Sequence, residues 1–362
     1  MKAAVLRSFG SSLAIEDVAE PALGTGEVIV DVAASRVLPY SNEVFSGERQ
    51  YLLDLPVVPG TGAIGRVHAA GPDATHLKPG DWVYCDPTVR SRDNVLAPDI
   101  TLQGLSARGD GGLKLQKHFR DGAWAERMRL PTENAIAIGP IEPDEAAPWC
   151  AMGTCLVPYG GWVAANLRPG ESVLVSGATG NFGSAAVAVA LAMGAPWVVA
   201  PGRNEAVLAD LVRRFGKRVL PVRLSGNEAD DRQRMLAAAP GPIDCVMDLM
   251  PPQVTTSTVR AALMTVRQNG RVVLMGGVGM LGGAGLDLPY PWIMRNCITI
   301  HGVWMYPREA IPRMIGLVRA GLLDLGQFTV TEFPLARANE AVAHAAANGG
   351  PFRMTVLKPG KV

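Results

Sequence analysis

Residues 173–203 read VLVSGATGNFGSAAVAVALAMGAPWVVAPGR, and this stretch decides the fold of the second half of the chain. A short apolar run at 173–175 ends at a glycine-containing loop, which leads into an alanine-rich segment of helical period. A second apolar run follows at 197–200. Strand, glycine turn, helix and strand in this order are typical of the first βαβ unit of a dinucleotide-binding fold.

The glycines of this loop indicate what it binds. Gly177, Gly180 and Gly183 recur every third residue, and the pattern G-x-G-x-x-G is present with Ala178 in place of its first glycine. Glycine permits a tight turn, a close approach of backbone N–H groups to a pyrophosphate, and close contact between helix and strand. An ordinary glycine-rich turn would share these letters, but the two flanking strands favour a dinucleotide site. We predict cofactor contacts at Gly177, Thr179, Gly180, Asn181, Phe182, Gly183, Gly202, Arg203 and Gly276.

The end of the second strand bears on the choice of cofactor. It reads APGRN at 200–204, with no acidic residue before Glu205. A site for NAD places a carboxylate here for the ribose 2′-OH, and that carboxylate would repel a 2′-phosphate. A guanidinium can bind the phosphate through charge-assisted hydrogen bonds. Arg203 therefore predicts NADPH as the cofactor; the alternative is that Arg203 is a solvated loop residue.

The composition restricts the class of protein. The chain has 362 residues, 48% of them hydrophobic and 19% charged, so it is long enough for two domains with ample cores. A net charge of +1 without a basic stripe argues against nucleic acid or a membrane surface as a partner. The N-terminal residues lack the apolar region of a signal peptide, and no apolar run is long enough to span a bilayer. We therefore expect a cytoplasmic protein that acts on a small-molecule substrate.

The five cysteines predict free thiols. They are odd in number and scattered, and they contain no C-x-x-C pair. Cys150 and Cys155 are close enough in sequence to suggest metal or redox chemistry, but no second pair of His or Cys residues accompanies them. We expect reduced and mostly buried thiols.

The order of the expected elements predicts two domains. Apolar alternation and turn signals indicate an all-β first part, followed by a long functional or partner-facing loop at 90–120. From residue 169 onward, strands alternate with helices, as in a parallel, doubly wound sheet. The expected strands are 1–6, 27–33, 60–70, 82–85, 173–176, 197–200, 218–222, 244–248, 271–276, 298–304, 328–333 and 354–357. We also expect a helix at 308–320.

These elements predict an α/β protein. A β-barrel domain would cover residues 1–154 and be completed by residues 303–362. A Rossmann-type dinucleotide-binding domain with a doubly wound parallel sheet would cover residues 155–302.

Five short sequences together resemble the medium-chain dehydrogenase/reductase superfamily over nearly the whole chain. They are GTGEV at 24–28, VPG at 58–60, LKPGDWV at 77–83, DGAWAE at 121–126 and GRVV at 270–273. The resemblance implies a GroES-like β-barrel catalytic domain, a Rossmann domain, and a cleft between them for the nicotinamide and the substrate. It also implies a homodimer formed through an edge strand of the Rossmann sheet, which residues 298–303 would supply.

The positions that hold the catalytic metal in zinc-dependent members of the superfamily differ in this chain. ASRV at 34–37 stands where those members have Ala-Ser-Gly-Val, and the ligand positions fall on Leu38, Thr61 and Gly153. Catalytic zinc needs three protein ligands from His, Cys or a carboxylate, and these residues offer none. The four cysteines of the structural zinc lobe are also missing between Val89 and Arg120. The resemblance therefore points to the zinc-free branch, with quinone oxidoreductases and enoyl reductases, and we expect no metal.

The missing zinc ligands bear on the reaction. Without a Lewis acid, hydride transfer to an activated C=C bond is easier than transfer to a carbonyl group, because conjugation spreads the negative charge onto an oxygen that hydrogen bonds can hold. A proton must then come from water or a positioned tyrosine. Our candidate catalytic residues are Tyr51, which resembles the donor of related enoyl reductases, Tyr40, at the position of the hydroxyl-bearing Thr of the zinc enzymes, and Ser41. The alternatives are aromatic cleft walls for the tyrosines and a turn cap for Ser41.

Three hypotheses about function follow. The first is a zinc-independent, NADPH-dependent reductase of an enone, an enoyl compound or a quinone. The second is a zinc-free alcohol dehydrogenase or carbonyl reductase, in which a tyrosine and the nicotinamide ribose manage the proton. The third is an NADPH-binding sensor that has kept the fold and lost turnover, since fold alone does not establish catalysis.

Overall fold

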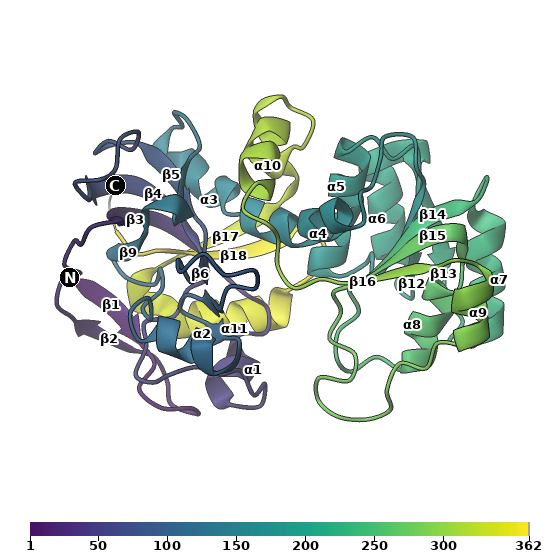
Figure 1. Cartoon of the computed structure of the whole chain (residues 1–362), viewed down its shortest axis with the longest axis horizontal. Helices are drawn as coiled ribbons and strands as arrows, with labels where there is room; N and C mark the ends of the chain where they lie inside the picture. Colours follow the sequence, from purple (N-terminus) through teal and green to yellow (C-terminus); the bar gives the residue numbers. More distant parts are fainter. Residues whose placement is uncertain (361–362) are drawn as a thin grey trace. The chain divides into compact units, whose positions relative to one another are not determined.

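The computed structural model describes residues 1–360, which form two units (Figure 1). Unit 1 comprises Met1–Gly153, Leu325–Gly349 and the segment that begins at Arg353, and unit 2 comprises Thr154–Asp324 and Gly350–Phe352. Residues 303–324, which the sequence assigned to the barrel domain, therefore cluster with unit 2. The physical reason is close packing at Gly160, where an added Cβ would lie 2.6 Å from the Met305 carbonyl oxygen and 2.6 Å from Tyr306 Cβ.

Unit 1 is built on β-sheets. Its strands are β1 (Lys2–Val5), β2 (Ala14–Asp17), β3 (Glu27–Val37), β4 (Ala63–Ala70), β5 (Trp82–Cys85), β6 (Thr88–Arg90), β7 (Ile100–Leu102), β8 (Ser106–Ala107), β9 (Arg127–Pro131), β10 (Ala135–Ala137), β17 (Thr329–Pro334) and β18 (Arg353–Lys358). The largest sheet has seven strands in the order β10-β5-β4-β3-β18-β17, with β9 paired to β3 off this path. Val28, Val30 and Val32 of β3 are fully buried, and they pack against apolar residues of β4, β5 and β9. Because β18 pairs antiparallel with β3, residues from the end of the chain join a sheet made by its first half.

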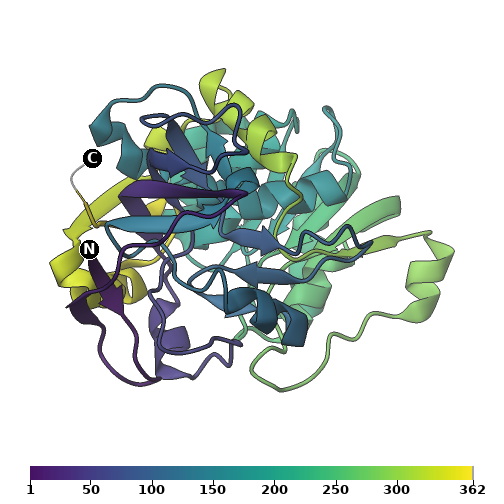
Figure 2. The ribbon, with the colours of Figure 1, turned by 60° about the vertical axis from the view of Figure 1, so that its left-hand side comes forward.

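Short helices flank these sheets. They are α1 (Ser41–Ser46), α2 (Gly109–Gln116), α3 (Ala146–Trp149) and α11 (Ala338–Asn348). Figure 2 shows α11 beside the yellow strands β17 and β18, and α11 also contacts β3 and α1. Only residues 38–40 separate the end of β3 from the start of α1. The candidate residues of this segment are therefore fixed between a buried strand and a helix.

The expectation of an irregular loop at 90–120 is wrong. This region contains β7, β8 and α2, and β6, β7 and β8 form a three-stranded sheet of their own. The sequence pattern did not predict α2 because this helix contains several glycines. In α2, an added Cβ at Gly111 would lie 2.2 Å from the Asp99 carboxylate, and one at Gly112 would lie 2.5 Å from the Ile100 carbonyl oxygen. These glycines allow close packing of the helix, and that packing overrides their poor helix propensity.

Unit 2 is a parallel sheet with helices on both faces. Its six strands run in the order β13-β12-β11-β14-β15-β16. They are β11 (Val173–Ser176), β12 (Val198–Gly202), β13 (Val219–Arg223), β14 (Ile243–Asp248), β15 (Val266–Leu274) and β16 (Thr299–Gly302). The helices are α4 (Met152–Ala164), α5 (Asn181–Ala192), α6 (Glu205–Phe215), α7 (Glu228–Ala238), α8 (Thr256–Leu263), α9 (Tyr290–Arg295) and α10 (Ala310–Arg319). Figure 1 shows α5 and α6 on one face of the sheet and α7 and α8 on the other, which confirms the predicted α/β class.

The strand order places the expected ligand site. The chain runs from β11 outward to β13 and then returns to β14 on the other side of β11. Open parallel sheets bind ligands at such a reversal, outside the carboxyl ends of the strands. In unit 2 that place is the carboxyl ends of β11 and β14, at Ser176 and Asp248.

Two further features of unit 2 agree with the sequence. Pro312 lies in the first turn of α10, where a missing N–H does not break a helical hydrogen bond. Strand β16 lies at the edge of the sheet, and its Ile300 is exposed. Within residues 1–360, no helix is both long enough and apolar enough to span a bilayer.

Candidate functional site

The glycine turn after β11 has the geometry of a dinucleotide cradle. Gly177 has a φ of +91°, and the Gly180 N–H donates to the Gly177 carbonyl oxygen at 2.9 Å. An added Cβ at Gly183 would lie 1.8 Å from that same carbonyl oxygen. Only glycine at this position lets the first turn of α5 lie directly against the turn that leaves β11. The cofactor contacts predicted at this turn stay a prediction.

The start of α5 presents backbone N–H groups of the kind that bind anions. The N–H of Ser184 makes the first helical hydrogen bond, to the Gly180 carbonyl oxygen at 2.9 Å. The preceding N–H groups, at residues 181–183, have no acceptor within the helix, and the helix dipole favours a negative charge beside them. Such a terminus binds the pyrophosphate of a dinucleotide. Asn181 and Phe182, both predicted cofactor contacts, are the first two residues of this helix.

The end of β12 lies close to the same turn. An added Cβ at Gly202 would lie 2.4 Å from Thr179 Cγ2, so both residues belong to one surface. Arg203 follows and is exposed, and its guanidinium makes no hydrogen bond or ion pair with residues 1–360. Glu205, the nearest acid, instead pairs with Arg223 at 2.5 Å. The strand end thus presents an available cation and no available carboxylate.

Asp248 is a residue of this site that the sequence reasoning missed. It ends β14, is almost fully buried, and accepts a hydrogen bond from the Met250 N–H at 3.3 Å. Gly276, a predicted cofactor contact, packs on it, since an added Cβ at Gly276 would lie 2.2 Å from Asp248 Oδ2. Burial raises the pKa of Asp248 to about 6, and hydrogen bonds from Ser176 and Met250 oppose the rise. The sequence signal that could have identified Asp248 is an Asp at the end of a predicted strand that lies beside the glycine turn.

Asp248 makes the stability of unit 2 depend on pH. Its pKa is higher in the folded protein than in the unfolded chain, so its contribution to stability is full below about pH 3 and is lost as the pH rises from there through about 6. We expect Asp248→Asn to raise the free energy of unfolding by up to about 3 kcal/mol at pH 8, and to leave it nearly unchanged at about pH 3. Urea unfolding at the two pH values measures this. The exposed Asp287→Asn is the control, and equal effects of Asp248→Asn at both pH values would contradict the assignment.

In unit 1, the structure brings Tyr40 and Tyr51 together. Their rings meet edge to face with centroids 6.5 Å apart. The Arg49 guanidinium lies over the Tyr40 ring, 4.3 Å from its centroid, and pairs with Glu43 at 2.6 Å. Burial, and to a lesser degree the neighbouring Tyr51, raises the pKa of Tyr40 well above its usual range, although Arg36 and Arg49 oppose this. The Tyr40 hydroxyl therefore stays protonated near neutral pH and can donate a hydrogen bond.

The positions that match the zinc ligands surround an arginine side chain. Arg36, at the end of β3, is almost fully buried, and its Nε donates to the Thr61 carbonyl oxygen at 3.4 Å. An added Cβ at Gly153 would lie 3.1 Å from the guanidinium carbon. Leu38 and Ser41 line the same small pocket as Arg36 and Thr61. No role was assigned to Arg36 from the sequence. The signal that could have identified it is an arginine at a position where zinc-dependent members of the superfamily have a glycine.

The residues at this place do not fit a metal ion. Leu38, Thr61 and Gly153 provide neither nitrogen, thiolate nor carboxylate ligands. Throughout residues 1–360, no three His, Cys, Asp or Glu side chains are grouped so that they could hold a metal. The cysteines are free thiols, and all but Cys297 are buried. Burial raises the pKa of the Cys150 thiol to about 12, so it stays protonated and is a poor ligand.

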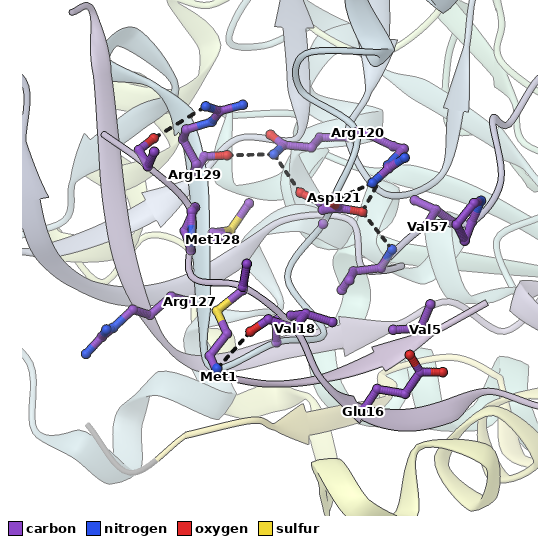
Figure 3. Close-up of a pocket in the computed structure, with 18 of the residues that line it drawn as sticks. Met1, Val5, Glu16, Val18, Val57, Arg120, Asp121, Arg127, Met128 and Arg129 are labelled. Carbon is purple, nitrogen blue, oxygen red and sulfur yellow. Dashed lines mark hydrogen bonds and ion pairs between the residues drawn. The ribbon is translucent and has the colours of Figure 1, made fainter. Parts of the chain in front are cut away.

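A further pocket of unit 1 lies at a different place (Figure 3), is open to solvent and has a volume of about 470 Å³. Arginines line it, but each has a carboxylate partner. The pairs are Arg7 with Glu16 at 2.5 Å, Arg120 with Asp121 at 3.3 Å, Arg127 with Asp31 at 2.8 Å and Arg129 with Glu27 at 3.6 Å. Figure 3 shows the Arg120 side chain turned toward Asp121. With these charges already paired, we assign no chemistry to this pocket.

Comparison with known proteins agrees with this architecture. Residues 24–140 match the alcohol dehydrogenase GroES-like domain, and residues 182–320 match the zinc-binding dehydrogenase family. An alcohol dehydrogenase of Moraxella sp. (strain TAE123) is 29% identical over 94% of each chain. Acryloyl-coenzyme A reductase of Metallosphaera sedula is 29% identical over 83% of this chain and 84% of its own length. The solved structure of alcohol dehydrogenase TADH from Thermus sp. ATN1 superposes with a TM-score of 0.82 at 22% identity, over 99% of both chains.

The two family matches follow the order that the sequence resemblance implies. The match at residues 24–140 lies within unit 1, and the match at residues 182–320 lies within unit 2. The relatives extend over nearly the full length of the chain. The expected resemblance is confirmed: this chain belongs to the medium-chain dehydrogenase/reductase superfamily of NAD(P)-dependent oxidoreductases.

Proposed function

We propose that this protein is a zinc-independent, NADPH-dependent reductase of an activated C=C bond. The observation that carries the proposal is which residues occupy the three positions that match the zinc ligands. Leu38, Thr61 and Gly153 lie around a buried Arg36 and leave no donor set for a metal. Hydride transfer to a conjugated C=C bond needs only that the developing negative charge on an oxygen be stabilised.

The residues of unit 2 support NADPH as the hydride source. When bound, NADPH supplies a hydride from its nicotinamide ring. The N-terminus of α5 would hold the pyrophosphate, and Gly183 keeps this helix close to the turn. Arg203 would bind the 2′-phosphate, which Glu205 does not repel because Arg223 pairs with it.

The residues of unit 1 would manage the proton. Tyr40 and Tyr51 are adjacent, and the raised pKa of Tyr40 keeps its hydroxyl protonated at neutral pH. A protonated hydroxyl can donate a hydrogen bond to a substrate oxygen and can supply a proton during the reaction. Ser41 is a second buried hydroxyl beside Arg36. We propose these three residues as the proton-donating and substrate-orienting groups.

A relative of known activity supports C=C reduction. The relative from Metallosphaera sedula is named acryloyl-coenzyme A reductase, and the C=C bond of an acryloyl group is conjugated with a carbonyl. The relative from Moraxella is named alcohol dehydrogenase, which favours a second candidate, a carbonyl reductase or alcohol dehydrogenase that works without zinc.

A substrate panel separates these functions. We expect the full chain to oxidise NADPH with 2-cyclohexen-1-one or a benzoquinone, with kcat/KM at least roughly tenfold above that for a saturated aldehyde. Turnover of the aldehyde alone would favour the second candidate. Tight NADPH binding without turnover of any member would instead indicate a sensor.

We also propose that the chain forms a homodimer through the edge of its parallel sheet. Strand β16 has no neighbour on its outer side within the described residues, and Ile300 of β16 is exposed. An exposed apolar edge is a ready site for pairing with a second chain. Sedimentation of the full chain measures this, and the mass of a monomer at micromolar concentration would contradict it.

A further inference from the structure

Arg36 is a fixed positive charge in the interior of unit 1. Its guanidinium stays protonated at any working pH, because arginine does not lose its proton in proteins. Only 6% of the residue is exposed, and its strand position is set by pairing with Val356 of β18. A buried charge destabilises a fold unless nearby polar groups compensate it, so a purely apolar side chain would be the simpler choice here.

The guanidinium occupies space that ligand side chains would need. Its Nε bonds to the Thr61 backbone, and the Gly153 backbone approaches so closely that an added Cβ would lie 3.1 Å from both Nε and the guanidinium carbon. A larger side chain at residue 153 would therefore require the Arg36 guanidinium to shift by a few tenths of an ångström or more. The positive charge observed at this place is the side chain of Arg36.

Next to Arg36 lies a small pocket that offers donors. The hydroxyl oxygen of Thr61 and the indole nitrogen of Trp124 are buried, and neither has a hydrogen-bond partner within residues 1–360. Indole nitrogen can only donate, and a threonine hydroxyl can donate as well. The residues that line the pocket include no carboxylate.

The pocket is narrow, with room for about one water-sized group. Buried polar groups are rarely left without a hydrogen-bond partner, so two such groups at one pocket indicate that the pocket binds a guest group from another molecule. A guest that suits a guanidinium, an indole N–H and a hydroxyl is a single acceptor oxygen. A carbonyl oxygen at the end of a larger molecule meets both the size and the chemistry.

We propose that this pocket binds the carbonyl oxygen of an α,β-unsaturated carbonyl substrate, and that Arg36 stabilises the negative charge that this oxygen gains. The inference rests on the proposed function. The hydride from NADPH brings an electron pair to the β-carbon, the C=C pair becomes the bond between the α-carbon and the carbonyl carbon, and the C=O pair moves onto the oxygen. A proton from the Tyr40 or Tyr51 hydroxyl, or from water, then adds at the α-carbon, and the C=O bond is restored.

Charge complementarity favours this role because hydrogen bonds from a cation strengthen as the oxygen becomes negative. Thr61 and Trp124 would add neutral donors to the same oxygen. Groups fixed around a developing oxyanion contribute to the transition state more than to substrate binding. Arg36 would therefore act mainly on kcat.

The test compares two arginines of one sheet, in the full chain. Arg36→Met removes the charge and keeps an unbranched side chain, and Arg36→Lys keeps a charge without the fork of donors. Arg66→Met is the matched control, because Arg66 lies on neighbouring strand β4, packs over the Trp82 ring at 4.7 Å, and does not line the pocket. We expect kcat/KM with 2-cyclohexen-1-one to fall about 100-fold to 1000-fold in Arg36→Met, mostly in kcat. The NADPH Kd should stay unchanged, and Arg66→Met should resemble the wild type.

A spectroscopic measurement separates this inference from the proposed function. With NADP⁺ bound no hydride is available, and the infrared carbonyl stretch of bound 2-cyclohexen-1-one reports polarisation of its oxygen directly. We expect a shift to lower frequency in the wild type and in Arg66→Met, a smaller shift in Arg36→Lys, and the smallest in Arg36→Met, where only the neutral donors of Thr61 and Trp124 remain. If the wild type reduces no enone, the proposed function fails, and the same spectra still show whether the pocket binds a carbonyl oxygen.

Two results would overturn the inference. One is a folded Arg36→Met protein that keeps both the carbonyl shift and a kcat within about threefold of the wild type. The other is a wild-type spectrum without any shift. Should Arg36→Met fail to fold, Thr61→Val removes only the hydroxyl: a reduced shift with roughly tenfold lower kcat supports the pocket, and unchanged values refute it.

Discussion

Gly183→Ala is expected to weaken NADPH binding severely. An added Cβ would lie 1.8 Å from the Gly177 carbonyl oxygen and 2.5 Å from its carbonyl carbon, and both are backbone atoms that no change of rotamer can move. Relief requires α5 to move away from the turn, which withdraws its N-terminal N–H groups from the pyrophosphate. We expect the Kd to rise at least about 100-fold, equivalent to about 2.7 kcal/mol.

The matched control is another glycine within a helix of unit 2. Gly316 lies inside α10, and an added Cβ there would meet nothing within 4 Å. Gly316→Ala should leave NADPH binding unchanged and raise stability by up to about 1 kcal/mol, since alanine favours the helix more than glycine does. Calorimetric titration with NADPH and thermal unfolding measure both variants. If Gly183→Ala bound NADPH within about threefold of the wild type, the cradle assignment would be wrong.

Arg203→Ala is expected to remove the preference for NADPH over NADH. A hydrogen bond to a charged group contributes about 1.5–3 kcal/mol, so the NADPH Kd should rise roughly 10-fold to 150-fold while the NADH Kd stays the same. Arg203 is exposed, and salt screens exposed charges. The effect should therefore be largest at low ionic strength.

An arginine on the following helix provides the control for Arg203. Arg213 of α6 is exposed and its partner is Asp210 within the same helix, so Arg213→Ala should change neither Kd. Fluorescence titration with both cofactors, at low and at high salt, measures the two variants. Equal NADPH affinity of Arg203→Ala and the wild type would show that Arg203 is only a solvated loop residue.

The dinucleotide-binding half of the fold could be predicted because its signals are local. The expected strand at 173–176 is β11, and the glycine spacing of the following turn reflects contacts between residues a few positions apart, such as Gly177 and Gly183. Apolar runs likewise located the other parallel strands, with ends displaced by a few residues. The local sequence is sufficient when the interacting residues are neighbours in the chain.

Residues whose roles depend on distant partners could not be predicted. Asp248 is a polar residue at a strand end until β14 pairs with β11 and Gly276 packs on it. In the sequence, Arg36 is an ordinary strand residue. Its role becomes evident only because the fold places Thr61 and Gly153 next to its side chain. The glycines of α2 suggested a loop because their packing partners precede the helix in a separate segment.

Turnover after removal of metal tests the central claim, which is that this enzyme transfers hydride without a bound metal ion. The full chain would be analysed for zinc, dialysed against a chelator, and assayed with NADPH and 2-cyclohexen-1-one. We predict less than stoichiometric zinc before dialysis, the same kcat/KM after it, and no increase when zinc is added. One tightly bound zinc ion per chain, with activity that is lost on its removal and restored on its return, would contradict the claim.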